Sequence, residues 1–306
     1  MEFQQTLRQS VSLIGIGLHS GAEVSVTIRP ARPNQGICFV RVDMEGAPHV
    51  SAHYKNVTHT QLATTLGRGR ITVATVEHLL AALHGLRIDN ATIEVNGSEL
   101  PILDGSAAPY VEAIQIVGIE TQRQIRPYLA LRKRIEIRSG DKWAVAEPSS
   151  GFEVHGSIEW NHPAIGKQEF CYREDETQFA EIADARTFGF LRDVEMMRQM
   201  GLARGGSLEN AIVLDDSGVL NPEGLRYSDE FARHKVLDAL GDFKLAGIEI
   251  QAFFRLHKAG HDLHGQLLSA IFKDPDNYEI IEGIEEDRRP SRVRTALASG
   301  FVAGIR

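Results

Sequence analysis

The chain has 306 residues, of which 42% are hydrophobic and 24% charged, with a formal net charge of −8. This composition is typical of a globular protein with two domains or one large one, and it argues against extensive disorder. The acidic balance also argues against a general nucleic-acid binder, because neutralising phosphates requires a basic surface. We therefore expect no nucleic-acid partner.

Cysteine usage and apolar segments bear on the compartment. The two cysteines, Cys38 and Cys171, form no CxxC pair, which excludes a cysteine zinc finger and disfavours a disulfide framework. The N-terminal MEFQQTLRQS lacks the basic and apolar regions of a signal peptide. No apolar run approaches the ~20 residues that cross a bilayer. We expect a cytoplasmic protein without stable membrane insertion.

The first third of the chain is predicted to be rich in β-strands. Alternating or short apolar runs predict strands at 24–28, 36–42 and 91–95. Helical spacing of apolar residues predicts a helix over 72–86, with Thr75 as a candidate N-cap and Gly85 as the C-terminal signal. A second helix is predicted within 101–118.

The remaining chain repeats this order. Strands are predicted at RKRIEIR, KWAVAEP and FEVHGSIEW, then a long helix over 229–246, the strand IEIQAFFRLH and a closing helix HGQLLSAIF. The segment 121–130 is polar, contains a proline and shows no clear period, so we place a domain boundary near residue 126. Both halves thus show strands, a long helix, a strand and another helix.

This repetition predicts an α+β fold with two similar domains, each a β-sheet layer packed on helices. The domains are expected at residues 1–126 and 127–306, and the second carries an insertion at about 189–221 with a helix, a glycine turn and a strand.

The stretch RHKVLDALGD (233–242) aligns chemistry-bearing side chains along one helix face. His234, Asp238 and Asp242 are spaced four residues apart, so they lie on one stripe, where the first two are close enough to hold a cation. A single His-x-x-x-Asp pair is weak evidence, and the alternative is a surface helix or a hydrogen-bonded core histidine. The continuation at Asp242 and the adjoining Lys235 favour a functional site.

Glu77 and His78 lie near the start of the first predicted long helix. Neighbouring helix positions diverge by about 100°, so one side chain can bind a metal while the other reaches a bound water from the side. The alternative is a solvent-facing glutamate beside a half-buried histidine. The zinc-peptidase signature HExxH is absent, and the inverted HxxEH fails at Ala74.

Three histidines fall within HKAGHDLHG, at His257, His261 and His264, next to Lys258. The two glycines of this segment suggest a loop that leaves a strand. The alternative to a chemical role is surface polarity, and we assign at most one of the three histidines to chemistry.

Together these residues predict a catalytic zinc site with an open fourth position, its ligands being His78, His234 and Asp238. The ion would lower the pKa of bound water towards ~7, and Glu77 would take the proton. A histidine kept charged by a nearby aspartate would protonate the leaving amine, and His261 with Asp242 suits this role. Iron(II) suits the same ligand set.

Motifs along nearly the whole chain resemble those of one enzyme family: GIGLHSG (15–21), TVEHLLAAL (75–83), ELPILDGSAAP (99–109), NHPAI (161–165), ARTFGF (185–190), GGS (205–207), RHKVLDALGD (233–242) and AGH (259–261). The chain is thereby similar to UDP-3-O-acyl-N-acetylglucosamine deacetylases, zinc amidases that commit Gram-negative bacteria to lipid A synthesis. The resemblance implies two repeated α+β domains with the active site at their interface, and the metal ligands, base and acid given above.

The resemblance also implies further roles. Thr187 would donate a hydrogen bond to the developing oxyanion, a contact worth ~2.7–4 kcal/mol in other acyl-transfer sites. Asp242 would support the acid electrostatically, Lys235 would lie over the sugar and phosphate, and Lys142 and Lys258 are candidates for the diphosphate. The implied partner is an acylated UDP-sugar; the residues leave the oligomeric state open, and we expect a monomer.

In the family the insertion forms an apolar passage for the acyl chain, where each buried CH₂ contributes ~0.8 kcal/mol. Candidate lining residues are Phe188, Val194, Met197, Leu202, Leu208 and Val213, for which the alternative is packing within the insertion. Trp160 stands before NHPAI, where the family has phenylalanine, and an indole could stack on uracil.

Two other functions compete with this interpretation. A zinc hydrolase of another amide, such as a peptide, would share the ligands, and a non-catalytic nucleotide-sugar-binding protein would hold a structural metal. Activity lost on chelation and regained with metal distinguishes a catalytic site from a structural one.

Overall fold

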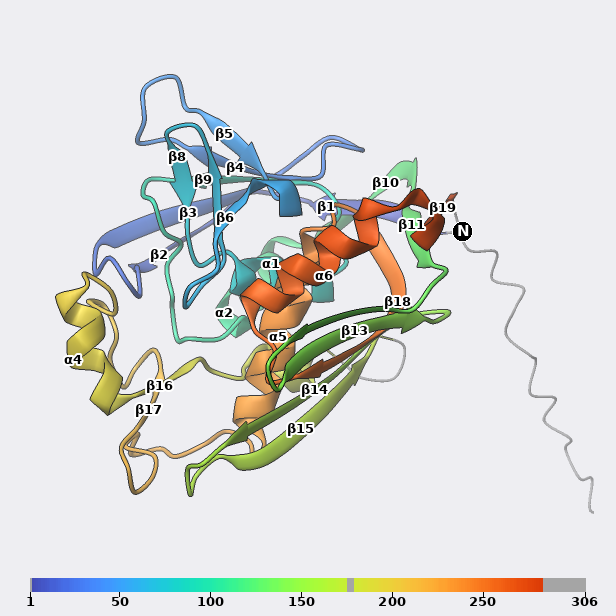
Figure 1. The fold of residues 1–306 in the computed structure, drawn as a ribbon. Coiled ribbons are helices and arrows are strands. Elements are labelled where there is room, and N and C mark those ends of the chain that lie inside the picture. The colour runs from blue at the N-terminus through green and yellow to red at the C-terminus, as the bar shows by residue number, and fades with distance from the viewer. Residues whose placement is uncertain (1, 175–178, 283–306) are drawn as a thin grey trace, which may run out of the picture.

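Two β-sheets enclose the central helices of the chain (Figure 1). A computed structural model describes residues 2–174 and 179–282. The five-stranded sheet has the order β2-β3-β9-β4-β5, with bounds β2 Val11–Ile16, β3 Glu23–Pro30, β9 Ala91–Val95, β4 Ile37–Arg41 and β5 His49–Ser51. The helices between the sheets are α1 Glu77–Gly85, α2 Ala108–Val117, α5 Glu230–Lys244 and α6 His261–Lys273.

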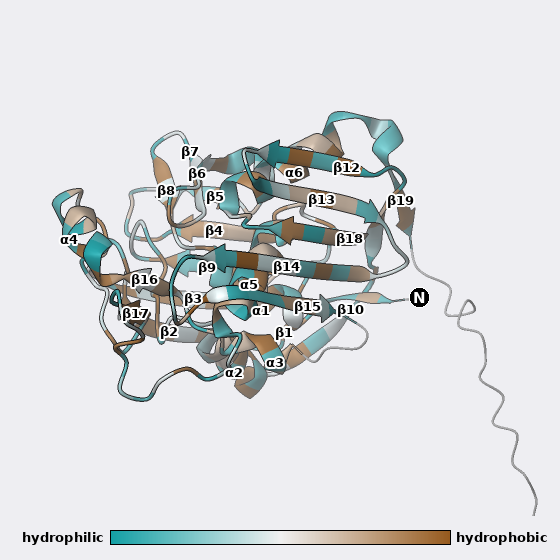
Figure 2. Ribbon diagram, turned by 60° about the horizontal axis from the view of Figure 1, so that its bottom comes forward, coloured by the Kyte–Doolittle hydropathy of each residue, from teal (hydrophilic) through white to brown (hydrophobic). Residues whose placement is uncertain are grey.

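The second sheet has seven strands. Its main path is β12-β13-β18-β11-β19, with bounds β12 Ile135–Ser139, β13 Lys142–Pro148, β18 Glu249–His257, β11 Pro127–Leu131 and β19 Tyr278–Glu282. Two more strands, β14 Phe152–Trp160 and β15 Gly166–Arg173, extend it, because β14 pairs in parallel with β18 and antiparallel with β15. Bands of hydrophobic and hydrophilic residues alternate along β14 in Figure 2, and every second residue over most of the strand is buried.

Smaller elements complete the fold: β1 Phe3–Leu7 pairs with β10 Ile119–Ile125, β6 Val57–His59 and β8 Ile71–Val73 flank β7 Thr65–Arg68, and β16 Phe188–Phe190 pairs with β17 Ile212–Leu214. The short helices are η1 Tyr54–Asn56, α3 Ala180–Ala183, α4 Leu191–Gln199 and η2 Pro275–Asn277. Helix α4 lies at one end of the molecule, away from the central helices (Figure 1).

In each large sheet, one central strand directly follows a helix that carries a candidate metal ligand, His78 on α1 or His234 on α5. Strand β9 follows α1 and lies between antiparallel β3 and parallel β4, whereas β18 follows α5 and lies between antiparallel β13 and parallel β11 and β14. The α+β prediction is confirmed. The five-stranded sheet uses residues up to 95 and the seven-stranded sheet uses residues from 127, while the division into domains at 126 stays a prediction. Residues 283–306 of the second predicted domain lie outside the described residues.

The hydrophobic core runs without a break from one sheet through the helices to the other. Val26 on β3, Leu79 on α1, Leu240 on α5 and Phe254 on β18 belong to one buried cluster, each with no exposed surface. Among the described residues, no helix combines the length and the apolar character needed to span a membrane.

The predicted start of the first long helix was wrong. Residues 71–73 form strand β8, and α1 begins only at Glu77. Thr75 is not the N-cap, because its φ is +57° and its hydroxyl donates to Glu99 Oε1 at 3.2 Å. The prediction failed because Val73 has the helical spacing to Val76, while together with Ile71 it also has the alternation of a strand.

The predicted loop at HKAGHDLHG was wrong in its second half. Strand β18 ends at His257, and α6 begins at His261 with Gly260 as the N-cap. His261 and His264 are therefore buried residues in the first turn of a helix, three positions apart on one face.

Candidate active site

Helices α1 and α5 pack directly against each other beneath the candidate metal ligands. Their close approach depends on Gly241, because a Cβ at this position would lie 2.0 Å from the carbonyl oxygen of Glu77. The contact places the first turn of α1, with Glu77 and His78, beside the turn of α5 that carries Asp238. Local sequence thus sets the distance between the two halves of the site.

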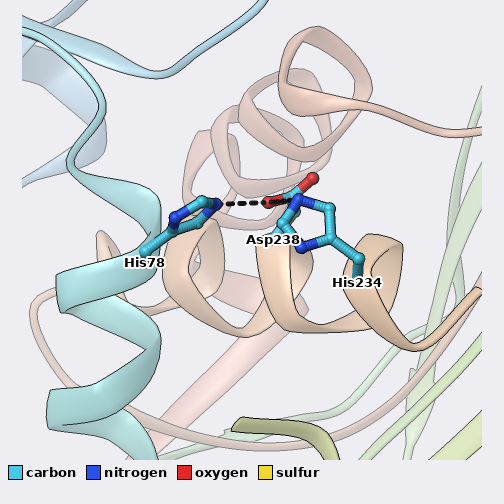
Figure 3. Close-up of side chains that lie close together, drawn as sticks. All are labelled: His78, His234 and Asp238. Atoms are coloured by element: carbon cyan, nitrogen blue, oxygen red, sulfur yellow. Dashed lines mark ion pairs between the residues drawn. The ribbon is translucent and has the colours of Figure 1, made fainter. Parts of the chain in front are cut away.

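His78, His234 and Asp238 converge with their ligand atoms facing one point (Figure 3). Asp238 Oδ1 lies 3.6 Å from His78 Nε2 and 3.4 Å from His234 Nε2. These separations exceed hydrogen-bond lengths. They are close to the about 3.3 Å expected between ligand atoms arranged tetrahedrally at zinc distances. The predicted ligand set is therefore assembled, and its chemistry and spacing fit a divalent ion.

Neighbouring groups fix the orientation of these ligands. His234 Nδ1 donates to the carbonyl oxygen of Ala185 at 3.0 Å, which leaves Nε2 with its lone pair towards the site. Burial lowers the pKa of His234 to about 3, so the ring is neutral, as a ligand must be. Lys235 Nζ donates to Asp238 Oδ2 at 2.9 Å, so the other carboxylate oxygen, Oδ1, faces the histidines.

Glu77 lies beside the ligands with a carboxylate almost removed from water. Burial raises the pKa of Glu77 above its usual value, despite the opposing charges of His261 and His78. The backbone N–H of Thr64 donates to Glu77 Oε2 at 3.1 Å, and Oε1 lies 3.8 Å from His261 Nε2. A buried carboxylate whose pKa is raised suits a general base.

His261 is held by the carboxylate of Asp242. His261 Nδ1 donates to Asp242 Oδ2 at 2.7 Å, and the Thr64 hydroxyl donates to Asp242 Oδ1 at 2.6 Å. Burial lowers the pKa of His261, but the charge and hydrogen bond of Asp242, with the charge of Glu77, outweigh it and raise the pKa to about 9. A histidine that stays protonated near neutral pH is a fitting general acid.

A cavity of about 650 Å³ opens over these side chains. Residues predicted for the site that line it are Glu77, His78, Lys142, Trp160, Thr187, Phe188, Met197, His234, Lys235, Asp238 and His261. Phe188 forms edge-to-face contacts with Trp160 and Phe231, and Lys235 Nζ lies 5.8 Å from its ring centroid. Asp242 lies outside the lining and reaches the cavity only through His261.

The motif ILDGSA positions Thr187 in the cavity wall. The Thr187 N–H donates to the carbonyl oxygen of Gly105 at 2.7 Å. Gly105 has a φ of +86°, and a Cβ there would lie 2.2 Å from the Asn210 carbonyl oxygen, so only glycine fits. The segment before Thr187 is anchored by Arg186, whose side chain donates to the fully buried Glu230.

Lys258, one of the two predicted diphosphate ligands, lies outside the lining of this cavity. Lys258 Nζ donates to Asp141 Oδ2 at 2.9 Å and lies 3.3 Å from Glu159 Oε2, and Lys258 is absent from the cavity lining. Its charge is therefore already balanced by two carboxylates, which the sequence did not indicate because they are distant along the chain.

The apolar wall of the cavity differs from the predicted passage. Helix α4 contributes Asp193, Met196 and Met197, and its C-cap Met200 adds to them; the four have the spacing of a single helix face. Val194 lies about 100° from Asp193 around the helix and is absent from the lining, and Leu202, Leu208 and Val213 also stand outside it. Leu208 is 41% exposed.

Sequence reasoning also missed several contacts. Thr64 binds both Glu77 and Asp242, and His264 donates to the same Asp242 oxygen as His261. The available signal was the spacing of three between His261 and His264, which places them on one face of a helix that begins at His261. Nothing in the sequence pointed to Thr64, because this residue belongs to neither a helix nor a strand.

A metal-ligand triad of two histidines and one carboxylate, flanked by a buried glutamate and a charged histidine, is the arrangement of a metal-dependent hydrolase. Comparison with known proteins narrows this class. Residues 4–273 match the family described as UDP-3-O-acyl N-acetylglycosamine deacetylase. The chain belongs to this family and is a deacetylase.

Curated relatives are similar over almost their whole length. The UDP-3-O-acyl-N-acetylglucosamine deacetylase of Geobacter sp. (strain M21) is 48% identical over 92% of this chain and 93% of its own. The enzyme of the same name from Myxococcus xanthus is 49% identical over 91% and 89%. That of Shewanella loihica is 44% identical over 99% of both chains.

Proposed function

We propose that this chain hydrolyses the acetamide of UDP-3-O-acyl-N-acetylglucosamine to acetate and UDP-3-O-acyl-glucosamine, the committed step of lipid A synthesis, with one Zn²⁺ per monomeric chain. The observation that carries the proposal is the convergence of side chains from α1, α5 and α6 in the lining of one cavity of about 650 Å³. Family membership supports the substrate. Iron(II) fits the same ligands, and the metal content of the purified protein decides between them.

In this proposal His78, His234 and Asp238 hold the ion, which supplies Lewis acidity that polarises the acetyl carbonyl and lowers the pKa of water. Glu77 takes the proton of the attacking water, for which its buried carboxylate with a raised pKa is suited. The water oxygen bonds to the acetyl carbon, and the C–N bond then breaks.

His261 delivers the proton that the leaving nitrogen needs. Its Nδ1 is bound by Asp242, so Nε2 is the atom available to the cavity, where it lies 3.8 Å from Glu77 Oε1. The base and the acid thus lie side by side. When the amine departs, Glu77 has gained one proton from water and His261 has given one to the nitrogen, and transfer of a proton from Glu77 to His261 restores both. Asp242 does not touch substrate and acts by keeping His261 charged and oriented.

Two further side chains stabilise charge in the cavity. Thr187 lines the cavity, where its hydroxyl can donate to the oxyanion that forms at the acetyl carbon, an interaction worth about 2.7–4 kcal/mol in comparable sites. Lys235 is positioned by Asp238 and Phe188 and presents its charge to the sugar and phosphate. Lys142 and Lys258 are the candidates for the diphosphate, and Lys142 lines this cavity.

The uracil and the acyl chain of the substrate are expected to contact aromatic and apolar residues of the cavity lining. Trp160 offers an aromatic face for uracil. Phe188, with Met196 and Met197 of α4 and the C-cap Met200, offers an apolar wall for the acyl chain. Methionine side chains adapt to ligands of varied shape.

The test is acetate release from UDP-3-O-acyl-N-acetylglucosamine with acyl chains of graded length, using native, chelated and zinc-restored enzyme. We expect release that is lost on chelation, returns with zinc and depends on chain length. Release from an acetylated peptide instead would identify a different amidase, and zinc-independent release would contradict the proposed chemistry.

Matched variants assign the roles. Glu77→Gln and His261→Ala should each lower kcat by at least about 100-fold, the usual contribution of general acid–base catalysis, while metal content stays at one per chain. His257→Ala is the control, because His257 pairs with Ser157 outside the cavity and should leave kcat unchanged. Equal activities of the His257 and His261 variants would refute the assignment of the acid.

A further inference from the structure

His264 contacts the same carboxylate oxygen as the candidate acid. His264 Nδ1 lies 2.8 Å from Asp242 Oδ2, and His261 Nδ1 lies 2.7 Å from that atom. The hydroxyl of Thr64 donates to the other carboxylate oxygen, Asp242 Oδ1. The carboxylate therefore has three donors, supplied by residues before α1 and by α6.

These short distances argue for a hydrogen-bonded cluster and against a second metal site, although the ligand atoms of Asp242, His261 and His264 lie within 4.8 Å of one another. Ligand atoms around a tetrahedral ion would be about 3.3 Å apart. The observed 2.7 and 2.8 Å are the lengths of charge-assisted hydrogen bonds.

The proton positions follow from the partners. An ionised carboxylate only accepts, so His264 Nδ1 must carry a hydrogen. His264 Nε2 is buried and has no hydrogen-bond partner among the described residues, and a proton there would be left unsatisfied at a substantial cost. His264 is thus expected as the neutral tautomer with its proton on Nδ1.

His264 cannot reach the substrate. Its relative exposure is 0%, it is absent from the cavity lining, and its ring packs 5.4 Å from that of Phe243. Any influence on the reaction must therefore pass through Asp242.

We propose that His264 is a positioning residue of the deacetylase, whose Nδ1–H donates to Asp242 and so fixes the carboxylate and limits how strongly it holds the proton on His261. The inference rests on the proposed function. Two donors on one oxygen share its charge, so removing one leaves a stronger acceptor for the other. His261 would then hold its proton more tightly and be a weaker acid.

The other charged groups near His261 are unaffected by a change of His264. Glu77 on α1 and Asp238 on α5 also favour the charged form of His261. Lys142 on β13 and Asp262, next to His261 on α6, line the same cavity. None of them contacts His264 in a described hydrogen bond or ion pair, so changing His264 alters one interaction of Asp242 alone.

The test compares His264→Leu, which keeps volume but removes the donor, with His264→Asn, whose amide keeps a donor near the position of Nδ1. For His264→Leu we expect kcat to fall roughly three- to tenfold, the effect of one hydrogen bond, with little change in KM. The alkaline limb of the kcat profile should move to higher pH by about 0.5–1 unit. His264→Asn should restore both values towards those of the native enzyme.

His84→Leu is the matched control, because His84 is an equally buried histidine with an unpartnered Nε2 whose nearest charged partner is Glu249. It should leave the alkaline limb in place. An unchanged limb in His264→Leu, or an equal shift in His264→Asn, would overturn the proposal.

A measurement on the native holoenzyme tests the proposal without any variant, and so remains possible if the variants fail to fold. Long-range ¹H–¹⁵N correlation spectra should show His264 protonated at Nδ1 and unprotonated at Nε2, and the opposite tautomer would overturn the proposal. If the native enzyme released no acetate while this tautomer was seen, the proposed function would fail and the hydrogen-bonded cluster would stand.

Discussion

Gly241→Ala offers a sharp test of the contact between α1 and α5. The added Cβ would meet the Glu77 carbonyl oxygen at 2.0 Å, against an ordinary contact of at least 3.4 Å, so the helices must separate by roughly 1.4 Å. Overpacking costs about 1–3 kcal/mol, and alanine in a helix returns about 1 kcal/mol relative to glycine. The expected loss of stability is therefore small.

The expected loss of activity is larger. His78 and Glu77 move with α1, whereas His234 and Asp238 move with α5, and a misplacement of about 1 Å can cost 100-fold in rate. We expect kcat/KM for acetate release to fall about 100-fold, with weaker zinc binding and a nearly native circular dichroism spectrum. Gly265→Ala on α6 is the control, because nothing lies within 4 Å of the added Cβ. Native kcat/KM and zinc affinity in Gly241→Ala would refute the reasoning.

Three more predictions follow from the site and its supports. Activity requires Glu77 ionised and His261 protonated, so kcat/KM should rise with pH through the raised pKa of Glu77 and fall above about 9, the pKa of His261. Asp242→Asn removes the charge that favours the imidazolium form of His261, so the descending limb of the profile should move to lower pH. A descending limb that did not move would contradict this prediction. Glu230→Ala should lower the free energy of unfolding by about 3–5 kcal/mol in urea titration, because the buried Arg186 would lose its buried partner and keep only the exposed Glu223, and a loss under 1 kcal/mol would count against the Arg186–Glu230 pair. Chelation should lower Tm without loss of helical signal, since the ion binds only the folded chain, and an unchanged Tm would argue against a bound ion.

Much of the fold was predictable because the periodic patterns were long. Strand β14 spans Phe152–Trp160 as its alternation predicted, β9 spans Ala91–Val95, and α5 covers nearly all of the predicted helix over 229–246. Each of these segments has one buried face, so the period of its apolar residues reports its conformation directly.

Element boundaries and long-range partners were less accessible. The short apolar run before α1 fits a strand and a helix equally, which displaced the predicted helix start. Lys258 looked available because Asp141 and Glu159 are 117 and 99 positions away in the sequence. The cavity-facing side of α4 depends on how that helix docks, and its own sequence does not fix this.

The site itself was predictable in composition and only partly in geometry. The spacing of four in α5 brings His234 and Asp238 together without any tertiary information. The arrival of His78 opposite them depends on the α1–α5 contact, and the role of His264 depends on where α6 begins.

Anomalous diffraction at the zinc edge, from crystals of the holoenzyme, would locate the ion directly. We expect one peak per chain, about 2.0–2.2 Å from His78 Nε2, His234 Nε2 and an Asp238 carboxylate oxygen. A peak at Asp242, His261 and His264 instead, or no peak in enzyme that releases acetate, would contradict this expectation.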